Sequence, residues 1–148
     1  MTEDQEAAIE RACAKLAIAF TNHVDNRRPD EAAEVFAVDG EFERRGETLA
    51  GREVIRATLK ARPATMLSRH LCANLAIDVI DENNARGVVS FAVYLHNFAE
   101  GEQGPAPLRD AEVVGEYHDV YVRTSEGWRI KRRNTTVAFR RQPQPKTA

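Results

Sequence analysis

Residues 70–80 read His-Leu-Cys-Ala-Asn-Leu-Ala-Ile-Asp-Val-Ile, and this stretch decides the fold class. Side chains alternate along it as they do in a β-strand that buries one face. The more apolar face carries Leu71, Ala73, Leu75, Ile77 and Val79. By alternation alone His70 lies on the opposite, outward face, unless a β-bulge re-phases part of the strand or another subunit covers the apolar face.

The residues that follow predict three more strands. Residues 85–98 are apolar on both faces, so this strand is predicted to be central. Residues 99–108 contain two glycines and two prolines and predict a mobile loop. The last two strands, residues 111–124 and 128–140, are predicted to pair around the turn Ser125-Glu126-Gly127.

The first part of the chain predicts three helices. Pro29-Asp30-Glu31 suits the first turn of a short second helix, and a third is predicted at about residues 51–61. The first is predicted over about residues 4–25, because one stripe has spacings of three and four residues. That stripe contains Ile9, Cys13, Leu16, Phe20 and Val24.

Two turn signals separate the second and third helices. Asp39-Gly40 is predicted to form a turn. Gly46 is predicted to lie at the tip of a small hairpin whose arms are residues 41–45 and 47–50.

Helices followed by long antiparallel strands form an α+β pattern. We expect a cone, in which three N-terminal helices pack on a strongly curved antiparallel sheet and enclose a small-molecule pocket. Residues 1–141 are predicted to form this single domain. Residues 142–148 are polar and contain proline, and are predicted to be a flexible tail.

Composition limits the classes of function. The 21 basic and 23 acidic residues nearly balance, which argues against a nucleic-acid binder. No apolar run approaches the roughly 20 residues of a membrane helix, so no membrane partner is expected. Two distant cysteines, Cys13 and Cys72, and an acidic N-terminus predict free thiols and a cytoplasmic location. The four histidines lack a metal-binding spacing and no phosphate loop is present, so neither metal nor cofactor is predicted.

Asp25 and His70 are the main candidates for chemistry in the pocket. Asp25 ends the first helix, where the helix dipole and burial would raise its pKa and suit it to general-base catalysis. The alternative is a solvated loop aspartate. His70 could exchange protons near neutral pH in a closed pocket, and is otherwise a surface histidine.

Five more residues are predicted to line the pocket and bind substrate. Tyr117, Asp119 and Tyr121 share one face of a strand. A phenol there could donate to a substrate carbonyl, and the carboxylate could orient a histidine. A solvent-facing row of tyrosines is the alternative. Tyr94 and His96 share a face of the central strand and are candidates for the same cavity.

Six short motifs in a fixed order point to a known family. They are Val24-Asp25-Asn26, Pro29-Asp30-Glu31, Asp39-Gly40-Glu41-Phe42, Gly51-Arg52-Glu53, Arg69-His70-Leu71-Cys72-Ala73-Asn74 and Gly127-Trp128-Arg129-Ile130. In their order and spacing, from about residue 5 to 140, the chain resembles a SnoaL-like protein of the NTF2-like superfamily. Within it the chain is most similar to the scytalone dehydratase-like branch.

The resemblance implies roles for particular residues. In that branch an aspartate at the end of the first helix and a histidine opening the third strand form a buried acid/base site, and Asp25 and His70 match them. A second family histidine would fall near Leu95 or His96. A family tyrosine is replaced by Val24, and Tyr121 stands where the family has an asparagine. The resemblance also implies a homodimer formed through the sheet.

Three functions remain open at this point. The first is a cofactor-independent lyase or isomerase, in which Asp25 and His70 move protons on an aromatic, polyketide-like or steroid-like substrate. The second is a protein that binds a small hydrophobic or aromatic ligand without chemistry. The third is a structural subunit resembling the β subunit of ring-hydroxylating dioxygenases, which would need a larger partner.

Overall fold

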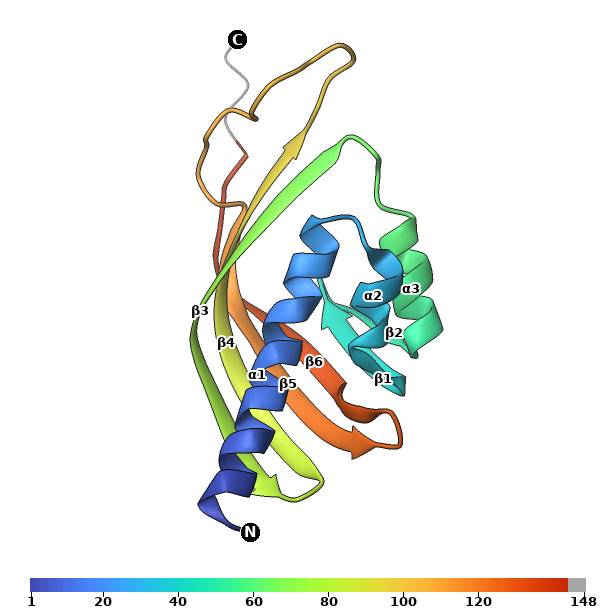
Figure 1. Cartoon of the computed structure of the whole chain (residues 1–148). Coiled ribbons are helices and arrows are strands. Elements are labelled where there is room, and N and C mark those ends of the chain that lie inside the picture. The colour runs from blue at the N-terminus through green and yellow to red at the C-terminus, as the bar shows by residue number, and fades with distance from the viewer. Residues whose placement is uncertain (144–148) are drawn as a thin grey trace.

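Three helices precede most of a six-stranded sheet in the computed structural model, which describes residues 1–143 (Figure 1). Residues 144–148 of the predicted tail therefore lie outside the described residues. Strand order across the sheet is β2-β1-β6-β5-β4-β3. The elements are α1 (Glu3–Asp25), α2 (Pro29–Glu34), β1 (Phe36–Arg44), β2 (Glu47–Ala50), α3 (Arg52–Lys60), β3 (Met66–Asp81), β4 (Asn84–Asn97), β5 (Val113–Thr124) and β6 (Gly127–Arg140).

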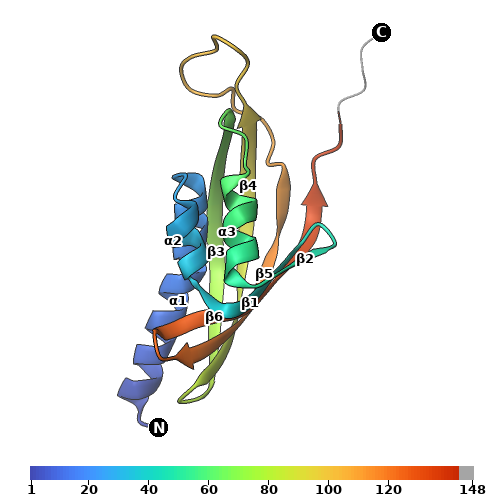
Figure 2. The same ribbon diagram turned by 90° about the vertical axis from the view of Figure 1, so that its right-hand side faces the viewer.

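The sheet is strongly curved, and α1 crosses its concave side (Figure 1). Helices α2 and α3 lie side by side next to β1 (Figure 2). The predicted α+β cone is confirmed.

Helix α1 starts with a reciprocal cap between Thr2 and Gln5. It buries most of the predicted stripe, and Phe20 packs edge-on against Phe36 and Phe42 of β1. No helix in the described part of the chain could cross a membrane.

Strand β1 departs from the prediction in two ways. It runs parallel to β6, so the sheet is not wholly antiparallel. It also begins at Phe36 and contains Asp39-Gly40, which is therefore not a turn. The register with β6 shifts between Phe36 and Glu41. A Cβ on Gly40 would come within 2.9 Å of the Ala37 carbonyl oxygen and 3.0 Å of that of Ile130, so only glycine fits this bend.

A β-bulge in β3 decides which residues reach the interior. Asn74 has φ of 51°, a left-handed conformation, and the register with β4 shifts between Ala73 and Ala76. Before the bulge, Ser68, His70 and Cys72 face inward, whereas Leu71 and Ala73 are exposed. After the bulge the inward set is Leu75, Ile77 and Val79. The predicted single apolar face is thus two half-faces, and His70 points inward without any partner subunit.

We expect Asn74→Val to lower the free energy of unfolding by about 1–3 kcal/mol, because a β-branched residue tolerates the left-handed conformation poorly. Asn74→Gly should unfold like the parent protein. The matched control is Ala73→Val, an exposed neighbour outside the left-handed region, which should change stability by less than about 0.5 kcal/mol. Urea denaturation measures all three, and equal losses at positions 73 and 74 would contradict the bulge.

Candidate active site

A cavity of about 690 Å³ lies against the concave side of the sheet. Its volume is in the range of small-molecule sites. The walls come from α1, β1, α3 and the four long strands, and one end is bordered by the segment after α3. The apolar part of its lining includes Phe20, Phe42, Phe91, Val93, Leu95 and Val137. His70 is the histidine that lines it.

The structure brings Asp25 and His70 together at this cavity. The imidazole Nδ1 lies 2.7 Å from Asp25 Oδ1, and the backbone N–H of His70 donates to Oδ2 at 2.7 Å. The side chains are 7% exposed for Asp25 and 11% for His70. Because the carboxylate holds Nδ1, the ring presents Nε2 as the nitrogen available to a ligand.

Asp25 has a lowered pKa, contrary to the prediction. Burial raises the pKa of this carboxyl. The two hydrogen bonds and the charge of His70, with a further bond from Ser68, outweigh burial and bring the pKa below its ordinary value. Asp25 therefore stays ionised at neutral pH. Its position suits it to orienting the imidazole and stabilising the imidazolium, while His70 is the group placed to exchange a proton.

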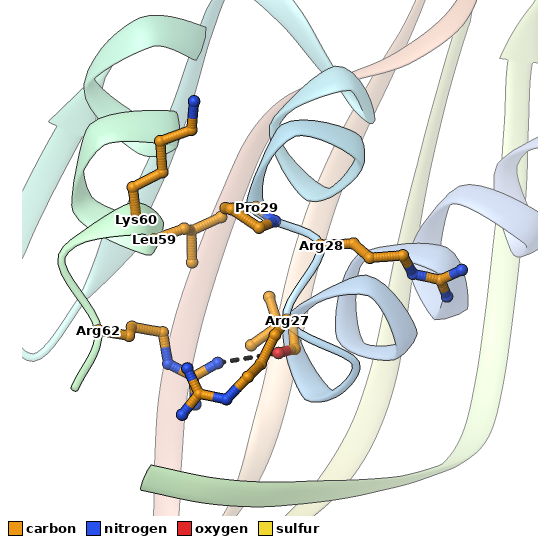
Figure 3. A pocket seen from close by; sticks show the side chains of 7 residues that line it. Arg27, Arg28, Pro29, Leu59, Lys60 and Arg62 are labelled. Carbon is orange, nitrogen blue, oxygen red and sulfur yellow. Dashed lines mark hydrogen bonds between the residues drawn. The ribbon is translucent and has the colours of Figure 1, made fainter. Parts of the chain in front are cut away.

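Ser68 holds the Asp25 carboxylate directly and Arg62 supports it through Ser68; both residues were missed from the sequence. Ser68 donates to Asp25 Oδ1 at 2.7 Å. Arg62 donates to the Ser68 hydroxyl at 3.0 Å and to the Val24 carbonyl at 3.0 Å, as the dashed line in Figure 3 shows for the second bond. Ser68 precedes His70 by two residues on the same strand face, which is the signal that could have found it. Arg62 follows α3 and has no such signal.

Tyr117 is the predicted residue of β5 that lines the cavity. Its ring stacks on Phe91, with centroids 4.2 Å apart and planes 11° apart. Burial raises the pKa of its hydroxyl, so the group stays protonated and can donate a hydrogen bond. Thr135 lies opposite Tyr117 on β6, lines the same cavity, and has a buried hydroxyl without a partner among residues 1–143. Both hydroxyls are suited to binding a polar ligand group.

Asp119 and Tyr121 face the interior but not the cavity. Arg133 is fully buried and donates to both oxygens of Asp119, from Nε at 2.7 Å and from Nη2 at 2.6 Å. The Tyr121 hydroxyl donates to Asp119 at 2.7 Å. Arg133 also donates to the Ala17 carbonyl of α1. The expected substrate-binding role of Asp119 and Tyr121 is not met, because their polar groups pair within the core beneath α1.

Tyr94 and His96 lie on the outer face of the sheet. Val93 and Leu95, their neighbours on β4, line the cavity, so alternation turns Tyr94 and His96 away from it. His96 Nε2 lies 2.8 Å from Glu102 of the following loop, and its ring meets Phe98 edge-on. The expectation that these two residues reach the cavity is therefore not met.

Comparison with protein families matches the SnoaL-like domain over residues 5–134. The chain belongs to the SnoaL-like family. A search of curated protein sequences found no match for this SnoaL-like chain.

Solved structures share the fold of this SnoaL-like domain. A candidate scytalone dehydratase from Novosphingobium aromaticivorans is 21% identical, with a TM-score of 0.79 over 99% of this chain and 95% of that chain. A hexachlorocyclohexane dehydrochlorinase, LinA type 2, is 18% identical, with a TM-score of 0.79 over 99% and 97%. An NTF2-like protein with a cystatin-like fold, also from N. aromaticivorans, is 19% identical, with a TM-score of 0.68 over 93% and 90%.

We expect Asp119→Asn to lower the free energy of unfolding by about 3–5 kcal/mol, because it leaves the Arg133 charge buried without its partner. Asp78→Asn is the control, since Asp78 pairs with Arg86 on the exposed surface and its loss should cost about 0–1 kcal/mol. Guanidinium denaturation followed by circular dichroism measures both variants. A loss at Asp119 no larger than at Asp78 would contradict the structural role of the buried pair.

Proposed function

We propose that this SnoaL-like protein is a cofactor-independent acid/base lyase or isomerase that acts on an aromatic, polyketide-like or steroid-like small molecule. The observation that carries the proposal is the Asp25–His70 pair, whose imidazole borders an apolar cavity while its Nδ1 is held by an ionised carboxylate. A histidine so oriented suits a general base whose charged form is stabilised by the carboxylate behind it.

The proposed reaction begins with proton transfer from carbon. His70 Nε2 removes a proton from the carbon next to a substrate carbonyl. The electron pair of the C–H bond forms a C=C bond while the carbonyl π pair moves onto the oxygen, which gives an enolate. The Tyr117 hydroxyl donates a hydrogen bond to that oxygen. In a lyase, the enolate re-forms the carbonyl, and a C=C bond forms between the α- and β-carbons as a group leaves the β-carbon. The leaving group takes the proton from the imidazolium. In an isomerase, the imidazolium returns the proton to a different carbon.

Names of proteins with similar structures support elimination chemistry. One is called a candidate scytalone dehydratase and another a hexachlorocyclohexane dehydrochlorinase, names that denote the loss of water and of hydrogen chloride. Proton abstraction followed by loss of a neighbouring group is common to both losses.

A cytoplasmic location fits Cys13 and Cys72, which are free thiols.

The two other functions have less support from the geometry. A protein that only binds a ligand, or a structural subunit of a ring-hydroxylating dioxygenase, does not need a buried carboxylate to fix one imidazole tautomer beside a cavity. The binding function nevertheless shares the cavity and its stacked Phe91 and Tyr117. Turnover, rather than binding, distinguishes it from the enzyme.

The test measures exchange of the α-hydrogens of 2-tetralone, a compact aromatic ketone, in D₂O by proton NMR. The parent protein should accelerate the exchange. His70→Ala should slow the catalysed exchange by about 10²–10⁴-fold, because the general base is lost. Tyr117→Phe should slow it by about 10–10³-fold, because the donor to the enolate oxygen is lost while the stacked ring remains.

Arg86→Gln serves as the control variant, since Arg86 pairs with Asp78 on the exposed surface and should leave the exchange rate unchanged. Binding of 2-tetralone to each variant is followed by saturation-transfer NMR. Catalysed exchange that survives His70→Ala contradicts the acid/base role. Binding of the ketone by the parent without any catalysed exchange favours the ligand-binding function.

We also propose a homodimer that forms through the outer face of the sheet. Leu71 is 62% exposed, Phe139 71% and Val120 41%, and all three lie on this outer face. Half-buried Val88, Ala92 and Val114 lie between them. Such a row of apolar side chains on an exposed sheet face is typical of an interface with a second copy of the chain, and the charged Asp78, Arg86 and Arg132 of the same face border it. The β-bulge already turns His70 inward, so the dimer is proposed from this face alone.

We expect the parent protein to sediment as a dimer and Leu71→Glu to shift it toward the monomer, because two like charges would be desolvated across a two-fold interface. Analytical ultracentrifugation between about 1 and 100 μM measures the change. Val54→Glu is the control, since Val54 is also exposed but belongs to α3, away from the outer face. A parent protein that sediments as a monomer over this range contradicts the proposed dimer.

A further inference from the structure

The charged residues that line the cavity are mostly cationic. Arg44, Arg45, Arg62 and Arg140 belong to the lining, whereas Glu112 is its single carboxylate among the described residues. Glu112 already pairs with Arg141, which lies outside the lining. The Asp25 carboxylate lies behind His70 and is occupied by that residue and Ser68. The cavity therefore has an excess of positive charge that the protein itself does not neutralise.

Arg44 is the half-buried cation with the fewest partners. It follows Phe42 by two residues on β1, and its guanidinium lies 6.0 Å from the centre of that ring. Its Nε is buried without a hydrogen-bond partner among residues 1–143, and no carboxylate of that range forms an ion pair with it. Burial and the charge of Arg45 lower the pKa of Arg44, and the charge of Glu47, which lies opposite Arg44 on β2, only partly opposes them.

Arg62 is the second half-buried cation of the cavity. Its hydrogen bonds go to Val24, Ser68 and Met66, none of which carries a charge. Burial and the charges of Arg27 and Arg44 lower its pKa, against an opposing effect of the Asp25 carboxylate. Figure 3 shows Arg27 and Arg62 together at the end of α1. Arg62 thus lies close to Arg27 and Arg44 and also donates to Ser68, whose hydroxyl supports the Asp25–His70 pair.

Three other buried or half-buried arginines of this chain are neutralised by carboxylates. Arg133 is paired with Asp119, and Arg52 with Glu34 and Glu126. Arg56 contacts three carboxylates, those of Asp30, Glu34 and Glu53. Arg44 and Arg62, which border the cavity, lack such partners, and so does Arg129 at the start of β6, whose side chain lies outside the cavity lining. At the cavity, a countercharge supplied by the ligand fits two neighbouring cations without ion pairs.

We propose that the ligand of this cavity carries an oxyanion, such as a carboxylate, which is bound by Arg44 and Arg62 while its apolar ring body lies against Phe91 and Tyr117. The inference rests on the proposed function in that it names the substrate class of the same site. The oxyanion is placed near the Asp25–His70 pair, because Arg62 donates to Ser68 and Ser68 donates to Asp25. A neutral ligand would leave both guanidinium groups without an ion-pair partner.

The test compares two fluorescent probes that differ by one anionic group: 8-anilinonaphthalene-1-sulfonate and its neutral parent, N-phenylnaphthalen-1-amine. The parent protein should bind the sulfonate at least tenfold more tightly at low salt. Arg44→Gln should reduce this preference by about tenfold while binding the neutral probe as before, which also shows that the variant is folded. Arg44→Lys should keep part of the preference, because it keeps the charge.

Arg86→Gln is the matched control, because it also removes one positive charge but lies outside the cavity. Competition against the bound sulfonate by naphthalene-2-carboxylate and by 1-naphthyl phosphate then assigns the oxyanion to the carboxylate or phosphate class. Equal affinity of the parent protein for both probes overturns the inference. So does a preference that Arg44→Gln and Arg86→Gln reduce alike.

The outcome is separable from that of the proposed chemistry. His70→Ala removes the base but neither arginine, so it should keep the preference for the sulfonate while losing the catalysed exchange of 2-tetralone. A preference that stands while 2-tetralone binds without any catalysed exchange supports an anion-binding cavity and refutes the proposed enzyme. Catalysed exchange without the preference supports the enzyme and refutes the anionic ligand.

Discussion

The β-bulge at Asn74 is the constraint on which the interior depends. An unbroken strand would put either the His70 set or the Leu75 set inside, because its faces alternate strictly. One extra residue in the left-handed conformation lets the strand present both, first Ser68 and His70 to Asp25, then Leu75 and Ile77 to the core beneath α1. The local cost of that conformation is offset by the burial of both sets.

Asp25 joins the bulged strand to the first helix. Asp25 is the last residue of α1, and its carboxylate accepts hydrogen bonds from the backbone and the side chain of His70. The candidate site is therefore also a tertiary contact between α1 and β3. These bonds explain why its pKa falls despite burial and the unfavourable end of the helix dipole. The geometry that fixes the imidazole therefore also keeps the carboxylate ionised.

Most elements could be predicted from the sequence, because hydrophobic periodicity reports which residues share a face. The bulge could not be placed, although Asn74 stands alone among apolar neighbours. Alternation also could not orient Tyr94 and His96, since both faces of β4 are apolar. Alternation correctly predicted that Asp119 faces inward. Whether Asp119 reaches the cavity or pairs within the core depends on Arg133, which is distant in sequence and belongs to a strand rich in basic residues. Periodicity gives the face of a residue and not its partner.

Two polar clusters of the interior differ in one physical respect. Around Asp119, each carboxylate oxygen has a donor from Arg133, and Tyr121 adds another, so the two charges neutralise each other although Arg133 Nη1 has no hydrogen-bond partner among residues 1–143. Around the cavity, the Thr135 hydroxyl and Arg44 Nε are buried without partners among residues 1–143, and Arg44 has no ion pair there. A half-buried cation without an ion pair costs more than one unpaired N–H of a neutralised pair. That difference separates the cluster that holds the fold from the cluster that we assign to a ligand.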